Sequence, residues 1–599
     1  MSATLNHLFF DAVSAHRSLP AALRHKAGGE WVGITHDELR DRVRAVSAAL
    51  AELGISPGDR IAILSENRPE WAITDYACLT GRYVDVPVYP TLPAAQVAYV
   101  IRNSGSRVAF CSTRDQLAKL REARAEMPAL EHVVVFDGDA AGSGAIAFSE
   151  FEANGAAAAA LHSDWQAQAL EALPDDLATL IYTSGTTGEP KGVMLSHGNI
   201  ASNVAASLQV LELHPGQECL SFLPLSHIFE RMVGHYTMLS GGVIINYATN
   251  FDSVAAEIIE VRPHLLASVP RLYEKIFARV QSMAVAGGSL RRSIFEWASA
   301  TADKALEYRL EGRALPILLR IGLAVADLLV FRKLRARLGG KFEFAVSGGA
   351  PLNPAICRFF LAAGIPILEG YGLTETSPVI SVNRMEKIKP GTVGPPIPGV
   401  EIAIADDGEI LTRGPNLMKG YYQLPEATAE AIDSDGWFHT GDIGQIDADG
   451  YLRITDRKKD LIVTAGGKNI APQPIEALLK TSDLLSNAVL LGDRRPYPIM
   501  VLVPNFAALE KWAEHKGIKV GDRKDFVELP EVRDKLEREA RRLLRNLAHF
   551  ETPKKFLITP SEFSIDGGEL TPKLSVRRKV VEQKWAAEIE ALYNEPQHP

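Results

Sequence analysis

The strongest constraint on the fold is an alternation of helical patterns with short runs of β-branched residues, which continues from about residue 10 to residue 460. The runs occur at residues 60–64, 84–88, 108–110, 132–136, 179–182, 243–246, 265–269 and 342–347. Strands that alternate with helices form parallel α/β units. The sequence shows no repeat of 20–50 residues, so it does not support a solenoid or a propeller. The chain is therefore predicted to be an α/β protein.

The length and the texture of the chain predict more than one domain. A chain of 599 residues exceeds the usual size of a single domain. After Pro390 the pattern changes to short strands and turns, as at residues 408–411 and 450–454. The charged run DRKKD follows at residues 456–460. We predict one domain over residues 1–456, a second over residues 457–599, and a hinge near residues 456–460.

Charge and cysteine content exclude some functions. The 64 Lys and Arg residues are outnumbered by 73 Asp and Glu residues, which gives a net charge of −9. This balance argues against a nucleic-acid partner. The four cysteines lie at least 33 residues apart, so no zinc or redox spacing is present. The first residues show no basic segment followed by an apolar one, so we expect no export and a cytoplasmic location.

One apolar segment suggests contact with a membrane. Residues 314–331 are ALPILLRIGLAVADLLVF, and Arg320 and Asp327 within them argue against a transmembrane helix. Basic residues follow directly, namely Arg332, Lys333, Arg335, Arg337 and Lys341. Two interpretations stay open: a core helix with a solvated basic end, or a helix that lies peripherally on an anionic membrane surface.

A loop suited to phosphate lies at residues 180–192, which read LIYTSGTTGEPKG. An apolar run leads into Thr183, Ser184, Gly185, Thr186, Thr187 and Gly188, and Lys191 follows. Hydroxyls and glycine N–H groups within one turn can surround a polyphosphate, and Lys191 adds positive charge. The spacing differs from G-x-x-x-x-G-K-[ST], because Gly192 follows Lys191. We predict a nucleotide phosphate loop.

Two further stretches carry groups suited to a nucleotide. Within EGYGLTET at residues 369–376, Tyr371 offers an aromatic face for a purine and Thr374 a hydroxyl for the α-phosphate. Glu375 offers a hard oxygen ligand for Mg²⁺. The glycine pair in SGGAPL, residues 347–352, would let a nucleotide approach the backbone.

The order of the motifs resembles a known family. The phosphate loop is followed by YGLTET at residues 371–376, DGWFHTGDI at 435–443 and DRKKD at 456–460. These motifs resemble the adenylate-forming enzymes, a superfamily of acyl-CoA synthetases, beetle luciferase and peptide-synthetase adenylation domains. Residues 223–231, 261–264 and 269–275 resemble the long-chain acyl-CoA synthetases, as does the total length. The resemblance implies a large N-terminal domain of α/β layers with a distorted β-barrel part, and a small mobile α+β C-terminal domain.

The resemblance also assigns roles by position. Asp442 resembles the carboxylate that binds the ribose hydroxyls, Arg457 the arginine that contacts ribose or phosphate, and Lys459 the hinge residue. His227 resembles the residue between the carboxylate site and the acyl tunnel, although a satisfied core histidine is an alternative. Residues around the pantetheine tunnel would be Gly466, Gly467 and Lys468. The implied ATP site comprises Thr183, Ser184, Gly185, Thr186, Thr187, Gly188, Gly349, Ala350, Pro351, Glu369, Gly370, Tyr371, Gly372, Thr374, Asp442 and Arg457.

The sequence departs from the family pattern at the catalytic lysine of the small domain. The family segment resembles Thr-Pro-x-x-Lys-x-x-Arg, and here Ser575 stands at the lysine position. Lys573 lies two residues earlier, and residues two apart in an extended segment point to the same side. We expect Lys573 to neutralise charge during adenylation. The alternative is that one of the basic residues Arg577, Arg578 and Lys579 does so.

The motifs together predict a long-chain fatty acid–CoA ligase. A fatty acid and ATP would form acyl-AMP and pyrophosphate, and coenzyme A would then form acyl-CoA and AMP. Lys191, Thr374, Glu375 and Lys573 are the expected catalytic residues, with Mg²⁺ as cofactor held by Glu375 and with ATP and CoA as co-substrates. Acyl chain preference, downstream pathway and oligomeric state are not fixed by the sequence.

Two other functions stay open at this point. A fatty acyl or amino-acid adenylating enzyme would load a carrier protein, and FDS at residues 251–253 superficially resembles an ammonium-pairing motif. It follows the 223–231 element instead of lying inside it, so we predict Asp252 as a helix N-cap, and we expect no carrier domain. A non-catalytic nucleotide-dependent lipid binder would bind ATP without exchanging pyrophosphate.

Overall fold

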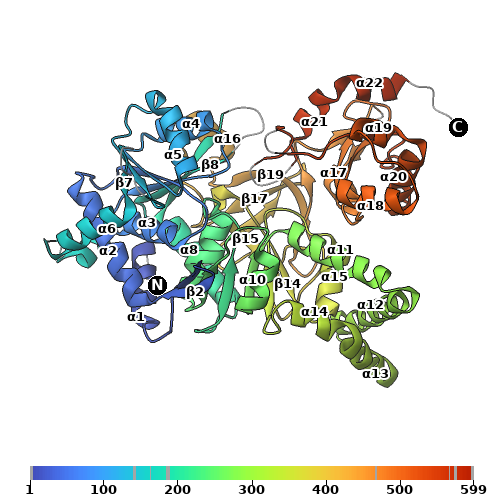
Figure 1. Cartoon of the computed structure of the whole chain (residues 1–599), viewed down its shortest axis with the longest axis horizontal. Coiled ribbons are helices and arrows are strands. Elements are labelled where there is room, and N and C mark those ends of the chain that lie inside the picture. Colours follow the sequence, from blue (N-terminus) through green and yellow to red (C-terminus); the bar gives the residue numbers. More distant parts are fainter. Residues whose placement is uncertain are drawn as a thin grey trace.

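Two eight-stranded sheets form the centre of the N-terminal part (Figure 1). The computed structural model describes residues 4–138, 144–161, 163–183, 189–465, 468–564, 567–571 and 576–594. One sheet has the order β18-β9-β8-β4-β3-β5-β6-β7 and is parallel, except that β9 and β18 run antiparallel to their neighbours. Its strands are β3 (Arg60–Leu64), β4 (Val84–Val88), β5 (Val108–Cys111), β6 (His132–Val135), β7 (Ile146–Ala147), β8 (Leu177–Thr183), β9 (Lys191–Ser196) and β18 (Gly420–Tyr421).

The second large sheet has the order β15-β14-β13-β12-β10-β11-β1-β2. Its strands are β1 (Leu23–Ala27), β2 (Glu30–Ile34), β10 (Glu218–Ser221), β11 (Ile244–Tyr247), β12 (Leu265–Ser268), β13 (Phe344–Ser347), β14 (Ile367–Gly372) and β15 (Val379–Val382). The inner strands are parallel, and the edge strands β2 and β15 are antiparallel to their neighbours. The α/β class predicted from the sequence is confirmed, because every predicted run of β-branched residues overlaps a strand of these sheets.

Helices connect the strands of the two sheets. They are α1 (Leu5–Ala15), α2 (His36–Glu52), α3 (Pro69–Thr80), α4 (Ala94–Ser104), α5 (Arg114–Glu122), α6 (Phe148–Ala158), α7 (Trp165–Leu170), α8 (His197–Val210), α9 (Met238–Ser240), α10 (Val254–Val261) and α15 (Pro354–Ala362). Sequence sets several of their starts: Thr35 and Glu38 form a capping box on α2, which satisfies two backbone N–H groups. Helix α10 begins at Val254 with Ser253 as the N-cap, so the prediction of Asp252 in that role was wrong by one residue.

A four-stranded antiparallel sheet occupies the region in which the resemblance implies a distorted β-barrel. Its strands are β16 (Glu401–Ile404), β17 (Glu409–Arg413), β19 (Phe438–Ile446) and β20 (Leu452–Arg457), with α16 (Pro425–Ala431) between β17 and β19. Strand β20 ends at Arg457, where the predicted hinge begins.

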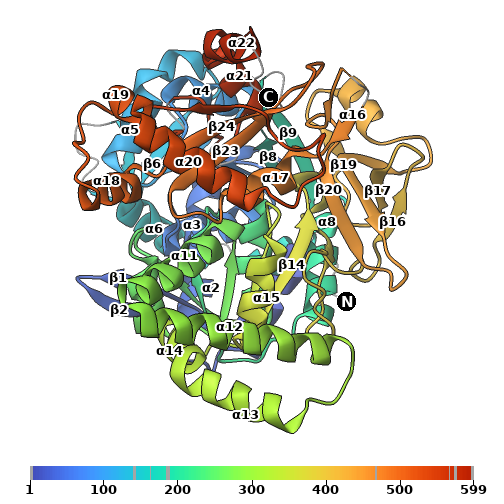
Figure 2. The ribbon, with the colours of Figure 1, turned by 90° about the vertical axis from the view of Figure 1, so that its right-hand side faces the viewer.

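The C-terminal part has cores of its own. Its strands are β21 (Ile462–Val463), β22 (Asn469–Ile470), β23 (Leu485–Leu491), β24 (Ile499–Pro504) and β25 (Phe556–Ile558). Its helices are α17 (Pro472–Leu479), α18 (Phe506–His515), α19 (Arg523–Glu528), α20 (Pro530–Leu543), α21 (Arg578–Lys584) and α22 (Ala586–Asn594). The mixed composition agrees with the predicted α+β character, and Figure 2 shows this part above the helices α11 (Pro270–Ala286) and α15.

A helical excursion separates β12 from β13. It comprises α11 (Pro270–Ala286), α12 (Ser289–Leu310), α13 (Ile317–Ala326), a π-helical segment (Asp327–Phe331) and α14 (Arg332–Arg337). Helix α12 packs against α15 and α13, and α13 is the outermost helix of this group (Figures 1 and 2). In α13 only Ala326 is fully buried, so the interpretation of this segment as a core helix was wrong. Among the described residues, no helix is long and apolar enough to span a bilayer.

A buried ionic network joins the two large sheets. Arg231 lies in the π-helical segment Glu230–Thr237, between β10 and β11, and is completely buried. Its guanidinium lies 2.5 Å from Asp75 on α3 and 3.0 Å from Asp85 on β4. Tyr236 and Thr179 complete the hydrogen bonds of the guanidinium. Arg231 thus makes four hydrogen bonds to carboxylate and hydroxyl oxygens, which offset the cost of burying its charge. The network therefore ties elements of both sheets to one side chain.

Candidate functional site

The strands on either side of the predicted phosphate loop pair with each other. Strand β8 ends at Thr183 and β9 begins at Lys191, and these two residues are register partners in the antiparallel pair. The loop between them is thereby closed at its base. The loop residues Ser184, Gly185, Thr186, Thr187 and Gly188 lie outside the described residues.

Lys191 and Glu375 are brought together by Tyr421. The Lys191 ammonium lies 4.8 Å from the centre of the Tyr421 ring, within the range of a cation–π contact. The Tyr421 hydroxyl donates a 2.9 Å hydrogen bond to Oε1 of Glu375. Tyr421 reaches this position because β18 pairs with β9. Sequence reasoning missed Tyr421, since no motif marks a residue whose role depends on a pairing between distant strands.

Thr374 lies beside this cluster. It begins the short 3₁₀ turn Thr374–Thr376 that follows β14, and it is buried. The carbonyl of Glu375 in the same turn accepts a 2.8 Å hydrogen bond from the N–H of Met418. The turn thus holds Thr374 and Glu375 at the end of a central strand, where ligands of α/β sheets commonly bind.

A second cluster joins β14 to the antiparallel sheet. The Tyr371 hydroxyl donates a 2.6 Å hydrogen bond to Oδ2 of Asp442. Nε of Arg457 lies 3.2 Å from Oδ1 of the same carboxylate. Burial raises the pKa of Asp442, and Arg457 and the Tyr371 hydroxyl oppose that rise. Each carboxylate oxygen can accept a second hydrogen bond, so Asp442 retains capacity for a diol.

The glycines of the predicted ATP site permit close backbone contacts. A Cβ on Gly372 would lie 1.8 Å from the carbonyl oxygen of Pro378. A Cβ on Gly370 would lie 3.4 Å from the carbonyl oxygen of Ser381. Gly349 has a φ of +79°, a left-handed conformation that favours glycine, and Ala350 and Pro351 follow it as exposed residues. The bend after β13 is therefore open to solvent.

Glu369 on β14 contacts a different part of the chain. Its Oε1 accepts a 3.2 Å hydrogen bond from the N–H of Gly391, and Cys357 lies beside it. Burial raises the pKa of Glu369 to about 7. This carboxyl is thus engaged with the loop before the antiparallel sheet, and its predicted contact with ATP stays a prediction.

The predicted acyl-site histidine is half-buried in the turn after β10. Nδ1 of His227 accepts a 3.0 Å hydrogen bond from the N–H of Phe229. The Phe229 ring packs against Gly348, where a Cβ would lie 3.1 Å from the ring. The absence of a side chain at Gly348 thus allows the His227 turn to approach the bend that contains Gly349.

The hinge region is held by contacts on both sides. Oδ1 of Asp456 accepts a 2.6 Å hydrogen bond from the N–H of Arg457, and its Oδ2 accepts a 3.3 Å bond from the N–H of Gln473 on α17. Burial raises the pKa of Asp456 to about 7. Lys458 pairs with Glu409 at 2.8 Å, and Lys459 is exposed. The carboxylate of Asp456 therefore links β20 directly to the C-terminal part.

The remaining predicted residues belong to the C-terminal part. Gly466, Gly467 and Lys573 lie outside the described residues. Lys468 is exposed, with its ammonium 5.9 Å from the ring centre of Phe550. Arg578, one alternative to Lys573, pairs with Glu476 at 2.6 Å and donates to the carbonyl of Leu490. In this arrangement Arg578 joins α21 to α17.

The residues present fit a magnesium ion that arrives with its nucleotide. Among the described residues, no group of three or more His, Cys, Asp or Glu side chains forms a cage for a metal. Mg²⁺ commonly uses one or two carboxylates together with water and substrate phosphates. Glu375, which Tyr421 orients beside Lys191, supplies such a carboxylate.

Sequence comparison identifies the family. The family described as AMP-binding enzyme matches residues 9–422, and the AMP-binding enzyme C-terminal domain matches residues 459–597. The chain therefore belongs to the AMP-binding enzymes, and the predicted membership of the adenylate-forming superfamily is confirmed.

Two curated relatives cover most of the chain. The long-chain-fatty-acid–CoA ligase FadD15 of Mycobacterium bovis is 39% identical and covers 94% of this chain and 93% of its own length. The peroxisomal long chain acyl-CoA synthetase 7 of Arabidopsis thaliana is 33% identical, over 95% of this chain and 82% of its own.

A solved structure supports the fold. The adenylation domain of a carboxylate reductase from Mycobacterium chelonae is 23% identical and superposes with a TM-score of 0.76. The similarity covers 99% of this chain and 91% of that one. At this level of identity the likeness supports the fold alone. That fold has a large N-terminal domain and a small C-terminal domain.

Proposed function

We propose that this AMP-binding enzyme is a long-chain fatty acid–CoA ligase that forms acyl-AMP and pyrophosphate, and then acyl-CoA and AMP. The observation that carries the proposal is the Lys191–Tyr421–Glu375 cluster beside the closed base of the phosphate loop. The relatives that match over almost the whole chain carry the same activity in their names. ATP is the co-substrate of the first half-reaction, and CoA is the co-substrate of the second.

In the first half-reaction the protein has to place positive charge beside the phosphates of ATP. A carboxylate is ionised at neutral pH and needs no general base to attack the α-phosphate. Lys191 would neutralise phosphate charge, and the Thr374 hydroxyl would donate to the α-phosphate. Mg²⁺, when bound, would supply further charge neutralisation at Glu375. Tyr421 acts as a positioning residue, because it fixes the Glu375 carboxylate and lies against Lys191.

The nucleoside would be held by the second cluster. Asp442 would accept hydrogen bonds from the ribose hydroxyls, and the Tyr371 ring would lie against the purine. Arg457 reaches the same carboxylate from the start of the hinge. Arg457 lies on β20 as the register partner of Asp442, so a rotation at Lys459 would move the C-terminal part relative to both residues between the half-reactions.

The proposal is tested with Lys191→Ala. Exchange of labelled pyrophosphate into ATP, driven by a long-chain fatty acid, should fall about 100-fold or more, as expected for loss of one oriented charge at a developing anion. Lys419→Ala is the matched control, since Lys419 is on the neighbouring segment and pairs with Asp175 instead. Equal exchange rates in the Lys191→Ala and Lys419→Ala variants would contradict the assignment.

The same assay distinguishes other functions. A ligase will convert the adenylate to a thioester when free CoA is added. Exchange without transfer to free CoA would indicate an enzyme that loads a carrier protein. Binding of ATP and fatty acid without exchange would indicate a non-catalytic lipid binder.

A further inference from the structure

Helix α13 presents an apolar face to solvent. Six large apolar residues, four on α13 and two on the π-helical segment that follows it, are between 41% and 84% exposed. They are Ile317, Leu318, Ile321, Val325, Leu328 and Leu329. Their spacing of three, four and seven residues places them on one side of the helix. Isolated exposed apolar residues are ordinary, but a continuous face of six marks a surface that binds something.

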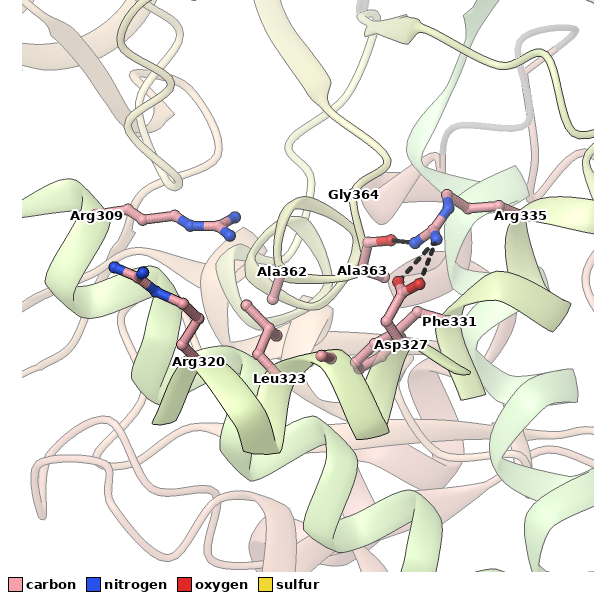
Figure 3. Close-up of a pocket in the computed structure, with 10 residues that line it drawn as sticks. Arg309, Arg320, Leu323, Asp327, Phe331, Arg335, Ala362, Ala363 and Gly364 are labelled. Atoms are coloured by element: carbon pink, nitrogen blue, oxygen red, sulfur yellow. Dashed lines mark hydrogen bonds and ion pairs between the residues drawn. The ribbon is translucent and has the colours of Figure 1, made fainter. Parts of the chain in front are cut away.

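A basic pocket borders this face. It has a volume of about 430 Å³ and lies between α12, α13 and the end of α15. Figure 3 shows Arg309 from α12 and Arg320 from α13 extending toward the same opening. Arg335 is held at the other end by Asp327, at 2.7 Å, and by the carbonyl of Ala363. On α13, Arg320 lines the pocket together with Leu323 and Ala324.

Several cations on α12, α13 and α14 have no acidic partner in the part of the chain that the structure describes. They are Arg309, Arg320, Arg332 and Lys333, all exposed. The acidic neighbours are engaged elsewhere: Glu311 pairs with Arg313, Asp327 with Arg335, and Asp303 and Glu307 with Arg358. The surface thus combines an apolar face with a positively charged border.

We propose that this surface docks the protein on a bilayer that contains anionic phospholipids. The apolar side chains of α13 would enter the boundary between headgroups and acyl chains, and Arg309 and Arg320 would bind a lipid phosphate. An amphipathic helix in this position lies in the plane of the membrane, which agrees with the absence of a spanning helix among the described residues.

Charge favours lipid over a second copy of the chain. A symmetric dimer through α13 would bring like charges together, with the cations of one copy facing those of the other. Anionic headgroups complement the same cations. The position of α13 also suits docking, because it lies at the edge of the molecule farthest from α21 and α22 and leaves the hinge free (Figure 2).

The test is sedimentation of the full chain with two kinds of vesicle, phosphatidylcholine alone and phosphatidylcholine mixed with phosphatidylglycerol. The wild type should bind the mixed vesicles more tightly, and the binding should weaken as salt is raised. Leu318→Ser/Ile321→Ser should abolish the binding. Arg309→Glu/Arg320→Glu should weaken it about tenfold or more, because each basic residue near an anionic surface contributes about fivefold.

Matched controls separate the surface from general effects. Leu173→Ser/Val520→Ser removes two apolar residues that are exposed elsewhere. Lys511→Glu/Lys519→Glu makes the same change in net charge on the C-terminal part. Both controls should bind vesicles like the wild type, and all four variants should retain pyrophosphate exchange, which shows that they fold.

Three outcomes would overturn the proposal. The first is wild-type binding by the serine variant of α13. The second is an equal loss of vesicle binding in Lys511→Glu/Lys519→Glu and in Arg309→Glu/Arg320→Glu, which would make net charge the cause. The third is a wild type that binds neither vesicle and forms a dimer that the serine variant breaks, which would assign the face to a second copy.

Discussion

The hydroxyl of Tyr371 donates a 2.6 Å hydrogen bond to the carboxylate of Asp442, and this bond joins the large β-sheet to the antiparallel sheet that leads into the hinge. Both residues are buried, and Arg457 reaches the same carboxylate. Tyr371 thus has two separable parts, a ring face and a hydroxyl that orients Asp442.

Tyr371→Phe should separate these parts. The ring remains while Asp442 loses a hydrogen bond of the charged type, which contributes about 1.5–3 kcal/mol. We expect the KM for ATP to rise about tenfold or more with a smaller change in kcat. Tyr451→Phe, which removes a hydrogen bond to the Lys387 carbonyl, is the control. An unchanged KM would mean that Asp442 needs no support from Tyr371.

Glu375→Gln should raise the magnesium concentration required for half-maximal pyrophosphate exchange, because an amide is a poorer ligand than a carboxylate for a hard cation. Tyr421→Phe should shift the requirement in the same direction but less, since the carboxylate remains and only its orientation is lost. The measurement is a magnesium titration of both variants. The same midpoint in wild type and Glu375→Gln would remove Glu375 as a ligand.

Lys459→Pro should block the second half-reaction. Proline fixes φ near −65° and also restricts the preceding residue, so the backbone rotation at the hinge is prevented. Adenylate formation should persist while thioester formation falls. Lys459→Ala removes the side chain but leaves the backbone free and serves as the control. Equal losses in both half-reactions would show that the hinge lies elsewhere.

Lys573→Ala should slow formation of acyl-adenylate and leave the conversion of supplied acyl-adenylate to thioester intact, because its positive charge is needed only in the first step. Lys579→Ala tests a neighbouring alternative. Normal adenylation by the Lys573→Ala variant together with a loss in Lys579→Ala would transfer the role. Arg578 makes a poor alternative, since it is paired with Glu476.

The buried carboxyl group of Glu230 should make the free energy of unfolding depend on pH. It is completely buried, and its Oε1 accepts a 2.6 Å hydrogen bond from Ser221 while its Oε2 has no partner among the described residues. Burial raises its pKa from 4.5 to about 8. The folded state therefore keeps the proton up to about pH 8, whereas the unfolded chain releases it near its ordinary pKa. Stability falls as pH rises through that window, by at most about 1.4 kcal/mol per pH unit.

Glu230→Gln removes this contribution and keeps the size of the side chain. The melting temperature of the wild type should therefore fall relative to the variant between about pH 5 and about pH 8. Thermal unfolding of both proteins at several pH values measures the difference. A constant difference across the range would show that Glu230 has the same protonation state in the folded and unfolded chains.

The strands of the fold could be predicted because each carries its own signal. Runs such as residues 60–64 and 84–88 are strands in the structure because β-branched residues fit a buried parallel sheet. The pairing of β9 with β18 had no such signal, since β18 has only two residues and lies far along the chain. Tyr421 was missed for that reason, although its neighbours Lys191 and Glu375 were predicted.

The exposure of α13 illustrates a similar limit. Residues 314–331 showed an apolar segment with a basic end, but sequence does not tell whether other helices cover an apolar face. In the structure α12 covers one side of α13 and leaves Leu318 and Ile321 exposed. Roles carried by Lys573 and by the phosphate-loop hydroxyls remain predictions, because these residues lie outside the described part of the chain.

The buried Arg231 determines which parts of the molecule can move. Any opening between the two large sheets would separate the guanidinium from Asp75 or Asp85 in a dry interior, and breaking a buried ion pair costs about 3–5 kcal/mol. A state of that energy would be populated by less than about one molecule in a hundred. We therefore expect the two sheets to move as one body, and we expect substrate-driven motion to be concentrated in the few backbone bonds that follow Asp456.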